Sequence, residues 1–185
     1  GDKKMRGEGG ILFNGTGDGY RKEQGVGIPS ENQLLEVWVK PRTLNKDESG
    51  KNQMQTIVSN GNGKEGYVIT QRGEQWLLIS GSSGVTEIGK VAKGVWTHLA
   101  MVVDEGKGSV WMNGKKTKTF NPTKAIADNF SIAISAEAEE PFHGEIYEVR
   151  YSTFPTGRVD PESDFLLDYK KIKEVNNQRL AERRS

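Results

Sequence analysis

Residues 95–120 constrain the fold more than any other stretch of the chain. Residues 95–103 are nearly all apolar or β-branched, which is typical of a central strand covered on both faces. A charged, glycine-containing turn follows at 104–108, and Asn113-Gly114 then supplies the two positive-φ positions of a type I′ hairpin. The return strand, 115–120, carries lysines and threonines that suit an edge. The stretch therefore predicts three consecutive antiparallel strands.

Short strand patterns separated by turn residues fill most of the remaining chain. In the clearest, 33–40, Leu35, Val37 and Val39 share one face. Others occupy 9–15, 55–60, 66–72, 75–80, 85–88, 130–135 and 145–151. Roughly a dozen short strands predict a two-sheet antiparallel sandwich rather than a βαβ fold. No GxGxxG follows a strand, so a dinucleotide site is unsupported.

The last strand pattern, 145–151, carries two glutamates. Strict alternation places Ile146, Glu148 and Arg150 on one face, opposite Glu145. Glu148 and Arg150 would then be close enough to pair, a structural role.

The chain changes character near its end, where glycine disappears and helix formers dominate. Leu166, Tyr169, Ile172 and Val175 recur every three residues and predict a short C-terminal helix that docks on the sandwich. The alternative is a connector or partner-binding helix of a longer protein. The expected organisation is a disordered or cloning-derived N-terminus, a β-sandwich and a helical extension, at 1–8, 9–157 and 158–185.

The charge balance and the absence of cysteine exclude several classes of function. The 185-residue chain has 26 basic and 25 acidic residues, so neither nucleic acid nor an anionic membrane surface is an indicated partner. The absence of cysteine excludes disulfides, thiolate metal sites and cysteine nucleophiles. No apolar run approaches transmembrane length.

Four segments in order resemble a laminin G-like domain of the concanavalin A-like lectin/glucanase superfamily. They are LFNGTGD at 12–18, LEVWVKP at 35–41, WTHLAMVVD at 96–104 with the Asn113-Gly114-Lys115 hairpin, and FHGEIYEVR at 142–150. The resemblance implies a jelly-roll sandwich of two antiparallel sheets and an extracytoplasmic location. It implies roles in carbohydrate binding, adhesion or appended modules, so the fold is better determined than the function.

Glu145 and Glu148 are the residues on which a glycosidase interpretation depends. Retaining glycosidases of the superfamily alternate Glu, Asp and Glu on one strand face, and the chemistry needs two carboxyls about 5 Å apart. Tyr147 occupies the central position here, and three residues separate the glutamates. An odd separation sends them to opposite faces unless a bulge intervenes. We therefore expect no catalysis.

His98 lies within an apolar strand and is the most tempting catalytic residue. The one other histidine is His143, and no Ser-His-Asp triad can be assembled from the sequence. The resemblance places His98 inside the sandwich beside Trp96, where we expect it to be hydrogen-bonded and structural.

Calcium is a cofactor that the resemblance suggests. Asp18, in a glycine-rich loop, is the best ligand candidate. Asn14 and Tyr147 stand where relatives often have aspartate, which weakens the case. The alternative is a turn aspartate that bonds its own backbone.

Sugar binding needs exposed aromatic rings with polar groups nearby. Trp38 and Trp96 are better core candidates. The candidate ligand-binding residues are Asn60, Asn62, Tyr67, Trp76 and Trp111.

The sequence therefore predicts a non-catalytic binding module of an exported or cell-surface protein, with polysaccharide or another surface polymer as the partner. One alternative is a structural or protein-interaction module of a larger envelope protein, with the C-terminal helix as a contact. The second alternative is a glycoside hydrolase.

Overall fold

The computed structural model describes residues 11–15, 17, 19–22, 32–44, 46, 48–60, 66–81, 84–123, 130–135 and 139–153. The described residues form twelve strands: β1 (Ile11–Asn14), β2 (Tyr20–Lys22), β3 (Gln33–Pro41), β4 (Met54–Ser59), β5 (Tyr67–Arg72), β6 (Gln75–Ser80), β7 (Gly84–Lys90), β8 (Thr97–Asp104), β9 (Lys107–Met112), β10 (Lys115–Phe120), β11 (Phe130–Ile132) and β12 (His143–Thr153).

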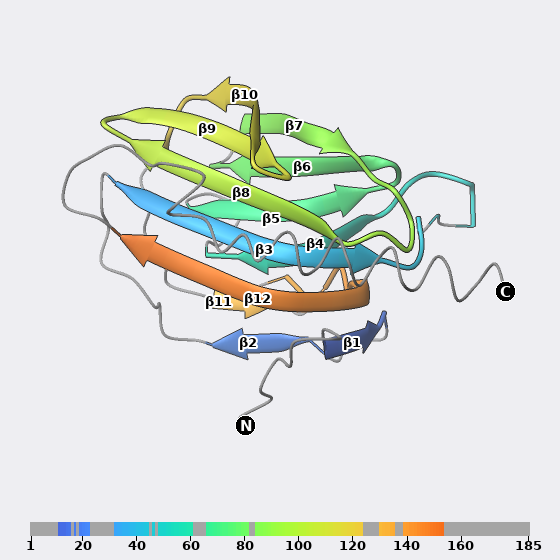
Figure 1. Ribbon diagram of the computed structural model, residues 1–185. Coiled ribbons are helices and arrows are strands. Elements are labelled where there is room, and N and C mark those ends of the chain that lie inside the picture. The colour runs from blue at the N-terminus through green and yellow to red at the C-terminus, as the bar shows by residue number, and fades with distance from the viewer. Residues whose placement is uncertain are drawn as a thin grey trace, which may run out of the picture.

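The strands build two stacked antiparallel sheets (Figure 1). The front sheet has the order β1-β12-β3-β8-β9-β10, and the back sheet has the order β2-β11-β4-β5-β6-β7. This arrangement confirms the predicted two-sheet sandwich of the jelly-roll type. The predicted N-terminus at 1–8 and the predicted C-terminal helix at 158–185 lie outside the described residues.

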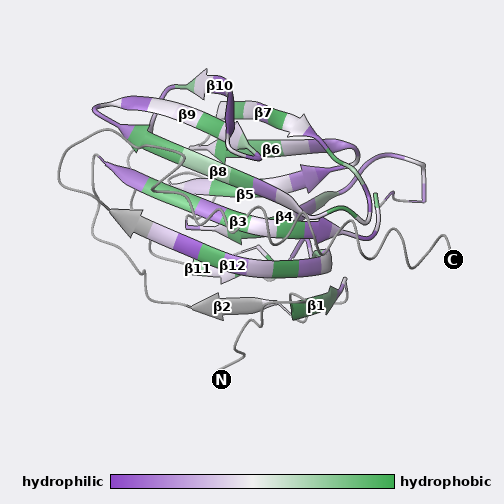
Figure 2. Ribbon diagram, viewed as in Figure 1, coloured by the Kyte–Doolittle hydropathy of each residue, from purple (hydrophilic) through white to green (hydrophobic). Residues whose placement is uncertain are grey.

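The centre of the front sheet consists of β3 and β8. All nine residues of β3 are buried, and so are residues 97–103 of β8, as expected for a strand covered on both faces. Figure 2 shows β8 as largely hydrophobic, next to the mixed colours of β3. One strand escaped prediction: β2 is only three residues long and has the sequence YRK, which gives no alternating pattern.

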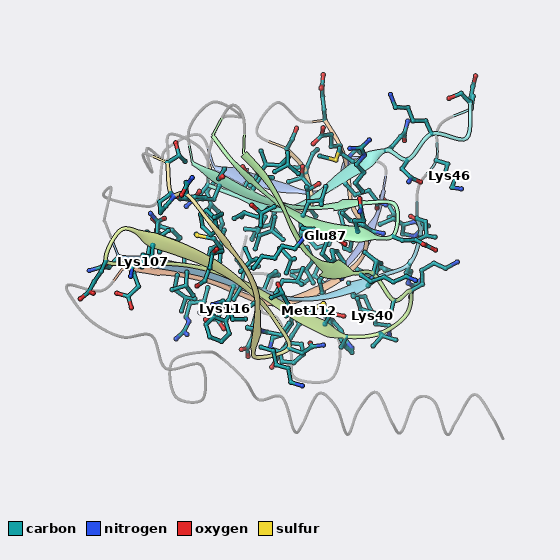
Figure 3. All side chains as sticks on the ribbon, turned by 90° about the horizontal axis from the view of Figure 1, so that it is seen from above. Lys40, Lys46, Glu87, Lys107, Met112 and Lys116 are labelled. Atoms are coloured by element: carbon teal, nitrogen blue, oxygen red, sulfur yellow. The ribbon has the colours of Figure 1, made fainter. Side chains whose placement is uncertain are left out.

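The connection between β3 and β4 leaves the body of the sandwich. Residues 45–52 are polar, and Lys46 lies out on this loop in Figure 3. An isolated bridge between Lys46 and Asn52 closes the loop on itself. The loop therefore has local structure although it contributes little to the core.

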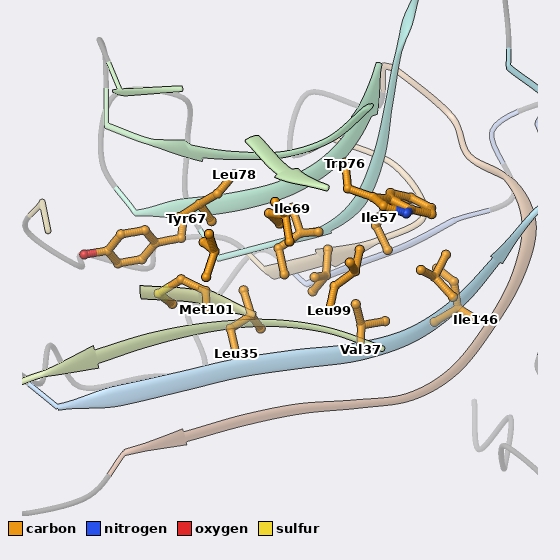
Figure 4. Packing of buried hydrophobic residues seen from close by; sticks show 14 of the residues in the cluster. Leu35, Val37, Ile57, Tyr67, Ile69, Trp76, Leu78, Leu99, Met101 and Ile146 are labelled. Carbon is orange, nitrogen blue, oxygen red and sulfur yellow. The ribbon is translucent and has the colours of Figure 1, made fainter. Parts of the chain in front are cut away.

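The core fills the space between the two sheets (Figure 4). Alternate residues of the central front strands point inward, and they meet large side chains from β4, β5 and β6. The large, fully buried members include Leu35, Leu99 and Met101 from the front sheet, Ile57, Tyr67, Ile69, Trp76, Leu78 and Ile88 from the back sheet, and Phe142 and Ile146 in and before β12.

The predicted hairpin at Asn113-Gly114 is present, with φ values of 53° and 81°. Asn113 also fastens this turn to β8, because its backbone N–H donates to the His98 carbonyl at 2.8 Å. Its side-chain Oδ1 accepts a hydrogen bond from the His98 N–H at 2.9 Å. One residue therefore closes the end of β8 through both its backbone and its side chain.

We predict that Asn113→Ala lowers the free energy of unfolding by about 1–2 kcal/mol, because the His98 N–H loses its acceptor and alanine tolerates positive φ poorly. Urea titration followed by tryptophan fluorescence measures the change. Lys115→Ala, an exposed neighbour, is the control and should leave the midpoint nearly unchanged. Equal effects of the two substitutions would contradict this role for Asn113.

Candidate binding site

A β-bulge in β12 decides which side chains reach the outer face of the front sheet. Tyr147 pairs with Trp38 and Val149 with Val37, so Glu148 is the extra residue, with φ at 47°. Ile146, Val149 and Tyr151 consequently belong to the inner core, while Glu145 and Arg150 are registered with outward-facing residues. The predicted alternation of this strand is therefore wrong beyond Tyr147, because strict period-2 counting assumes that no residue is inserted.

The bulge brings Arg150 into a row that crosses the outer face of the front sheet. Cross-strand partners share a face. The registers of β12, β3, β8, β9 and β10 therefore align Arg150, Glu36, Ala100, Trp111 and Lys116. Candidate residues that are distant in the sequence thus lie on one line.

A buried carboxylate ties three strands together in this row. Glu36 Oε1 lies 2.9 Å from His98 Nε2, and Glu36 Oε2 accepts a hydrogen bond from Arg150 Nε at 2.8 Å. The Glu36 and His98 side chains are 1% and 0% exposed. The carboxylate oxygens are therefore engaged by side chains from β8 and β12.

His98 faces outward from the front sheet, not into the sandwich. Leu99 and Met101 of the same strand occupy the interior instead. His98 is nevertheless fully buried, and its ring makes an edge contact with Trp38, with 5.2 Å between centroids. Sequence reasoning did not single out Glu36 as a site residue, although a single carboxylate within the apolar strand pattern at 33–40 indicates that its charge has a buried partner.

Aromatic residues lie beside this network on the same outer face. Trp96 and Tyr147 make an edge contact at 6.3 Å, and the Lys40 ammonium lies 5.8 Å from the Trp96 ring centroid. Lys40 also forms an ion pair with Glu145, with Nζ and Oε2 3.0 Å apart. Both side chains of the pair are largely buried, so the carboxylate of Glu145 is already committed to a cation.

Trp111 stands at the margin of this face and is partly exposed. Its indole Nε1–H donates to Ser109 Oγ at 2.9 Å, which fixes the orientation of the ring. Lys116, an exposed residue of β10, is its cross-strand partner. Of the predicted tryptophan platforms, Trp111 therefore retains an accessible ring.

Trp76 has a different environment. It is fully buried in the core between the sheets and offers no exposed ring for stacking on a sugar. The placement follows from the inward direction of its strand position, which alternation alone does not specify.

Tyr67 and Asn60 are also buried, at one end of the sandwich. Asn60 Oδ1 accepts a hydrogen bond from the Tyr67 N–H at 2.8 Å. The Tyr67 hydroxyl donates to the Thr123 carbonyl at 3.0 Å. These bonds close the end of the core. The other two candidates, Asn62 and Asp18, lie outside the described residues.

The two glutamates of β12 are the residues on which a glycosidase interpretation depends. The bulge lies at Glu148 itself, so the parity of the spacing between Glu145 and Glu148 does not decide their faces. Glu145 forms an ion pair with Lys40, and Tyr147 stands between the two glutamates in the strand. In the described part of the chain, no three histidine, aspartate or glutamate side chains gather as a metal site requires, and the role of Asp18 in calcium binding stays a prediction.

An open hollow in the β3–β4 loop is a second polar surface, which the sequence did not single out. Its lining residues are Lys46, Glu48, Ser49 and Gln53. From the sequence, their polar composition predicts only a loop. The bridge between Lys46 and Asn52 that closes this loop has no local sequence signal.

The family model of the concanavalin A-like lectin/glucanases superfamily (Laminin_G_3) matches residues 14–155. The chain belongs to this superfamily. The match covers β3 to β12 and the outer face of the front sheet, so the candidate site lies within the superfamily domain. No curated protein matches the chain.

Three solved structures show the same fold. Domain 4 of a GH43 extracellular arabinanase from Geobacillus stearothermophilus, in complex with arabinotriose, has 23% identity and a TM-score of 0.57, covering 89% of this chain and 75% of that one. A SAP-like pentraxin from Limulus polyphemus has 16% identity and a TM-score of 0.56, with coverages of 80% and 77%. A candidate carbohydrate-binding protein from Bacteroides ovatus has 17% identity and a TM-score of 0.61, with coverages of 85% and 46%. At these identities the likeness establishes the fold of this superfamily member.

Within the residues that the structure describes, no helix has the length and apolar character needed to cross a bilayer.

The two tyrosines at the end of the sandwich predict loss of stability at high pH. Burial raises the pKa of Tyr67 and of Tyr151 above the ordinary value of 10.0, and hydrogen bonds with Thr123 and Asn60 respectively offset part of this effect. The folded state therefore holds the phenolic protons more tightly than the unfolded state. Their contribution is fully present below about pH 10 and is lost as the pH rises further.

We expect the urea midpoint to fall as the pH rises above about 10, and Tyr67→Phe to flatten that fall because it removes one of the two linked protons. Urea titrations at several pH values, on the intact chain and the variant, measure the slopes. Identical slopes would contradict the assignment.

We further predict that Glu36→Gln lowers the free energy of unfolding by about 2–4 kcal/mol, because it removes the shared carboxylate and leaves the buried His98 and the Arg150 guanidinium without it. Glu87→Gln is the matched control, since Glu87 pairs with Lys118 at 3.8 Å on the surface. That substitution should cost less than about 1 kcal/mol. Similar losses from both variants would contradict a special role for Glu36.

Proposed function

We propose that the chain is a non-catalytic carbohydrate-binding module of an exported or cell-surface protein. The observation that carries the proposal is Trp111, a partly exposed indole whose orientation is fixed by Ser109. Membership of the lectin/glucanases superfamily supports it, as does the likeness to an arabinanase domain solved with arabinotriose.

The surroundings of Trp111 suit a sugar. An indole face packs against the C–H face of a pyranose or furanose ring, and nearby polar groups bond the hydroxyls. Ser109 and Thr119 are cross-strand partners in the row next to Trp111 and Lys116. The margin of the front sheet therefore combines one aromatic platform with two hydroxyls and an ammonium group.

The state of the carboxylates favours binding over hydrolysis. A retaining glycosidase needs one free carboxylate as nucleophile and a second as acid and base. Glu145 is paired with Lys40, and Glu36 is buried between His98 and Arg150. We infer that these groups stabilise the sheet and do not act on a substrate.

An extracytoplasmic location forms part of the same proposal. It is supported by the superfamily and by the extracellular arabinanase among the similar structures.

Isothermal titration against arabinan, xylan, β-glucan and mannan tests the proposal. We expect the intact chain to bind at least one polymer and Trp111→Ala to weaken that binding about tenfold or more, which corresponds to about 1.4 kcal/mol. Lys118→Ala, on the same strand pair, is the control and should bind like the intact chain. Failure of the intact chain to bind any of the four polymers would overturn the proposal. Binding that survives Trp111→Ala and is lost in Gln53→Ala would move the site to the hollow of the β3–β4 loop and overturn the role of Trp111.

A further inference from the structure

The outer face of the front sheet is buried, which is unusual for a two-layer sandwich. Antiparallel sheets of this kind pack one face on the core and present a polar face to water. Here the outward side chains Leu34, Trp38 and Val102 are only 2–3% exposed, and Ala100 is fully buried. Neighbours within the sheet shield such side chains only from the sides. A covering layer is therefore needed.

The buried face is also apolar. One cluster consists of Leu34, Ala100 and Val102, with Trp111 packed against it. A second cluster consists of Trp38 and Trp96, with Tyr147 packed against it. Together they form an apolar surface on either side of the Glu36 network, and such a surface favours an apolar partner.

We propose that residues 158–185 form an amphipathic helix that packs on this face as a third layer. This packing would be a property of the chain itself and does not depend on carbohydrate binding. The occupant is identified by its length, its apolar stripe and its point of attachment.

Residues 154–185 are the longest stretch outside the described residues. The chain reaches them from Thr153, which pairs with Gln33 at the start of β3. Gln33 is adjacent to Leu34 of the first cluster, so the segment departs next to the face that needs a cover. The four residues from 154 to 157 can span up to about 14 Å before the helix begins, enough to turn back over the sheet.

The dimensions of the stripe match those of the face. Leu166, Tyr169, Ile172 and Val175 would extend over about 14 Å of a helix, at 1.5 Å per residue. Each step of three residues turns the stripe by about 60°, so it crosses the face obliquely and three consecutive members lie within about 120°. The outward residues from Leu34 to Lys40 extend over about 20 Å along β3. Three apolar side chains of one helix can therefore face the sheet at the same time.

The charges are complementary as well. Arg150 on this face has a side chain that is 31% exposed, and Lys40 contributes a second cation. The segment carries Asp164 and Asp168, four residues apart, so both lie on one side of a helix that flanks the stripe. Such pairing fixes orientation more than it adds stability.

The absence of cysteine allows a clean test by thiol labelling. Ala100→Cys in the full chain should react with a maleimide at least about tenfold more slowly than Lys118→Cys, whose side chain is 55% exposed. Adding Leu166→Asp and Ile172→Asp should remove this protection. Gln178→Asp with Ala181→Asp adds the same two charges on the opposite side of the helix and should preserve it.

Cross-linking provides a second readout that does not require a destabilising substitution. A short bis-maleimide should join Ala100→Cys to Tyr169→Cys within one chain. It should join Ala100→Cys to Lys171→Cys much less, because Lys171 is about 200° around the helix from Tyr169.

Three outcomes would overturn the proposal. The first is rapid labelling of Ala100→Cys in the intact chain. The second is protection that persists in the Leu166→Asp, Ile172→Asp variant. The third is protection that rises with protein concentration, together with cross-links between chains, which would identify a second copy as the cover.

Discussion

Burial of β3 on both faces is the constraint on which the front sheet depends. The polar groups of a strand in that position cannot hydrogen-bond to water, so each of them needs a partner within the protein. Glu36 is shared by His98 and Arg150, Lys40 pairs with Glu145, and Gln33 accepts a hydrogen bond from the Tyr151 hydroxyl. These contacts join β3 to β8 and β12 at several heights. They fix the register of β3 more strictly than apolar contacts alone would. A shift by one residue would leave an unpaired charge in the core.

The features that sequence reasoning recovered are those with a local chemical cause. The Asn113-Gly114 turn is specified by two residues that tolerate positive φ, and the doubly buried strand at 97–103 by its apolar run at 99–103. The bulge at Glu148 has no local sequence signal. The φ of 47° at this glutamate results from the way the neighbouring strands pair. Missing it reverses every later side chain of the strand. Arg150 and Glu36, 114 positions apart, could therefore not be paired from the sequence.

The same limit separates the two tryptophans that the sequence proposed as platforms. Alternation along a strand states which residues share a face, and the packing of the second sheet decides which face is inside. Trp76 points into that interface, whereas Trp111 stands on the outer face. The candidate site is thus a margin between an accessible edge and a buried apolar surface. Its geometry depends on the outer layer of the front sheet as much as on the residues that would touch a ligand.

The composition of β10 has a consequence for crowded conditions. This strand ends the front sheet, and five of its six residues are exposed, with Lys115, Lys116 and Lys118 among them. An incoming strand from another molecule would have to bring its own backbone alongside three ammonium groups, and two copies meeting at β10 would repel each other. Lysine keeps its charge across the whole physiological range. At high protein concentration we therefore expect molecules not to join edge to edge through β10.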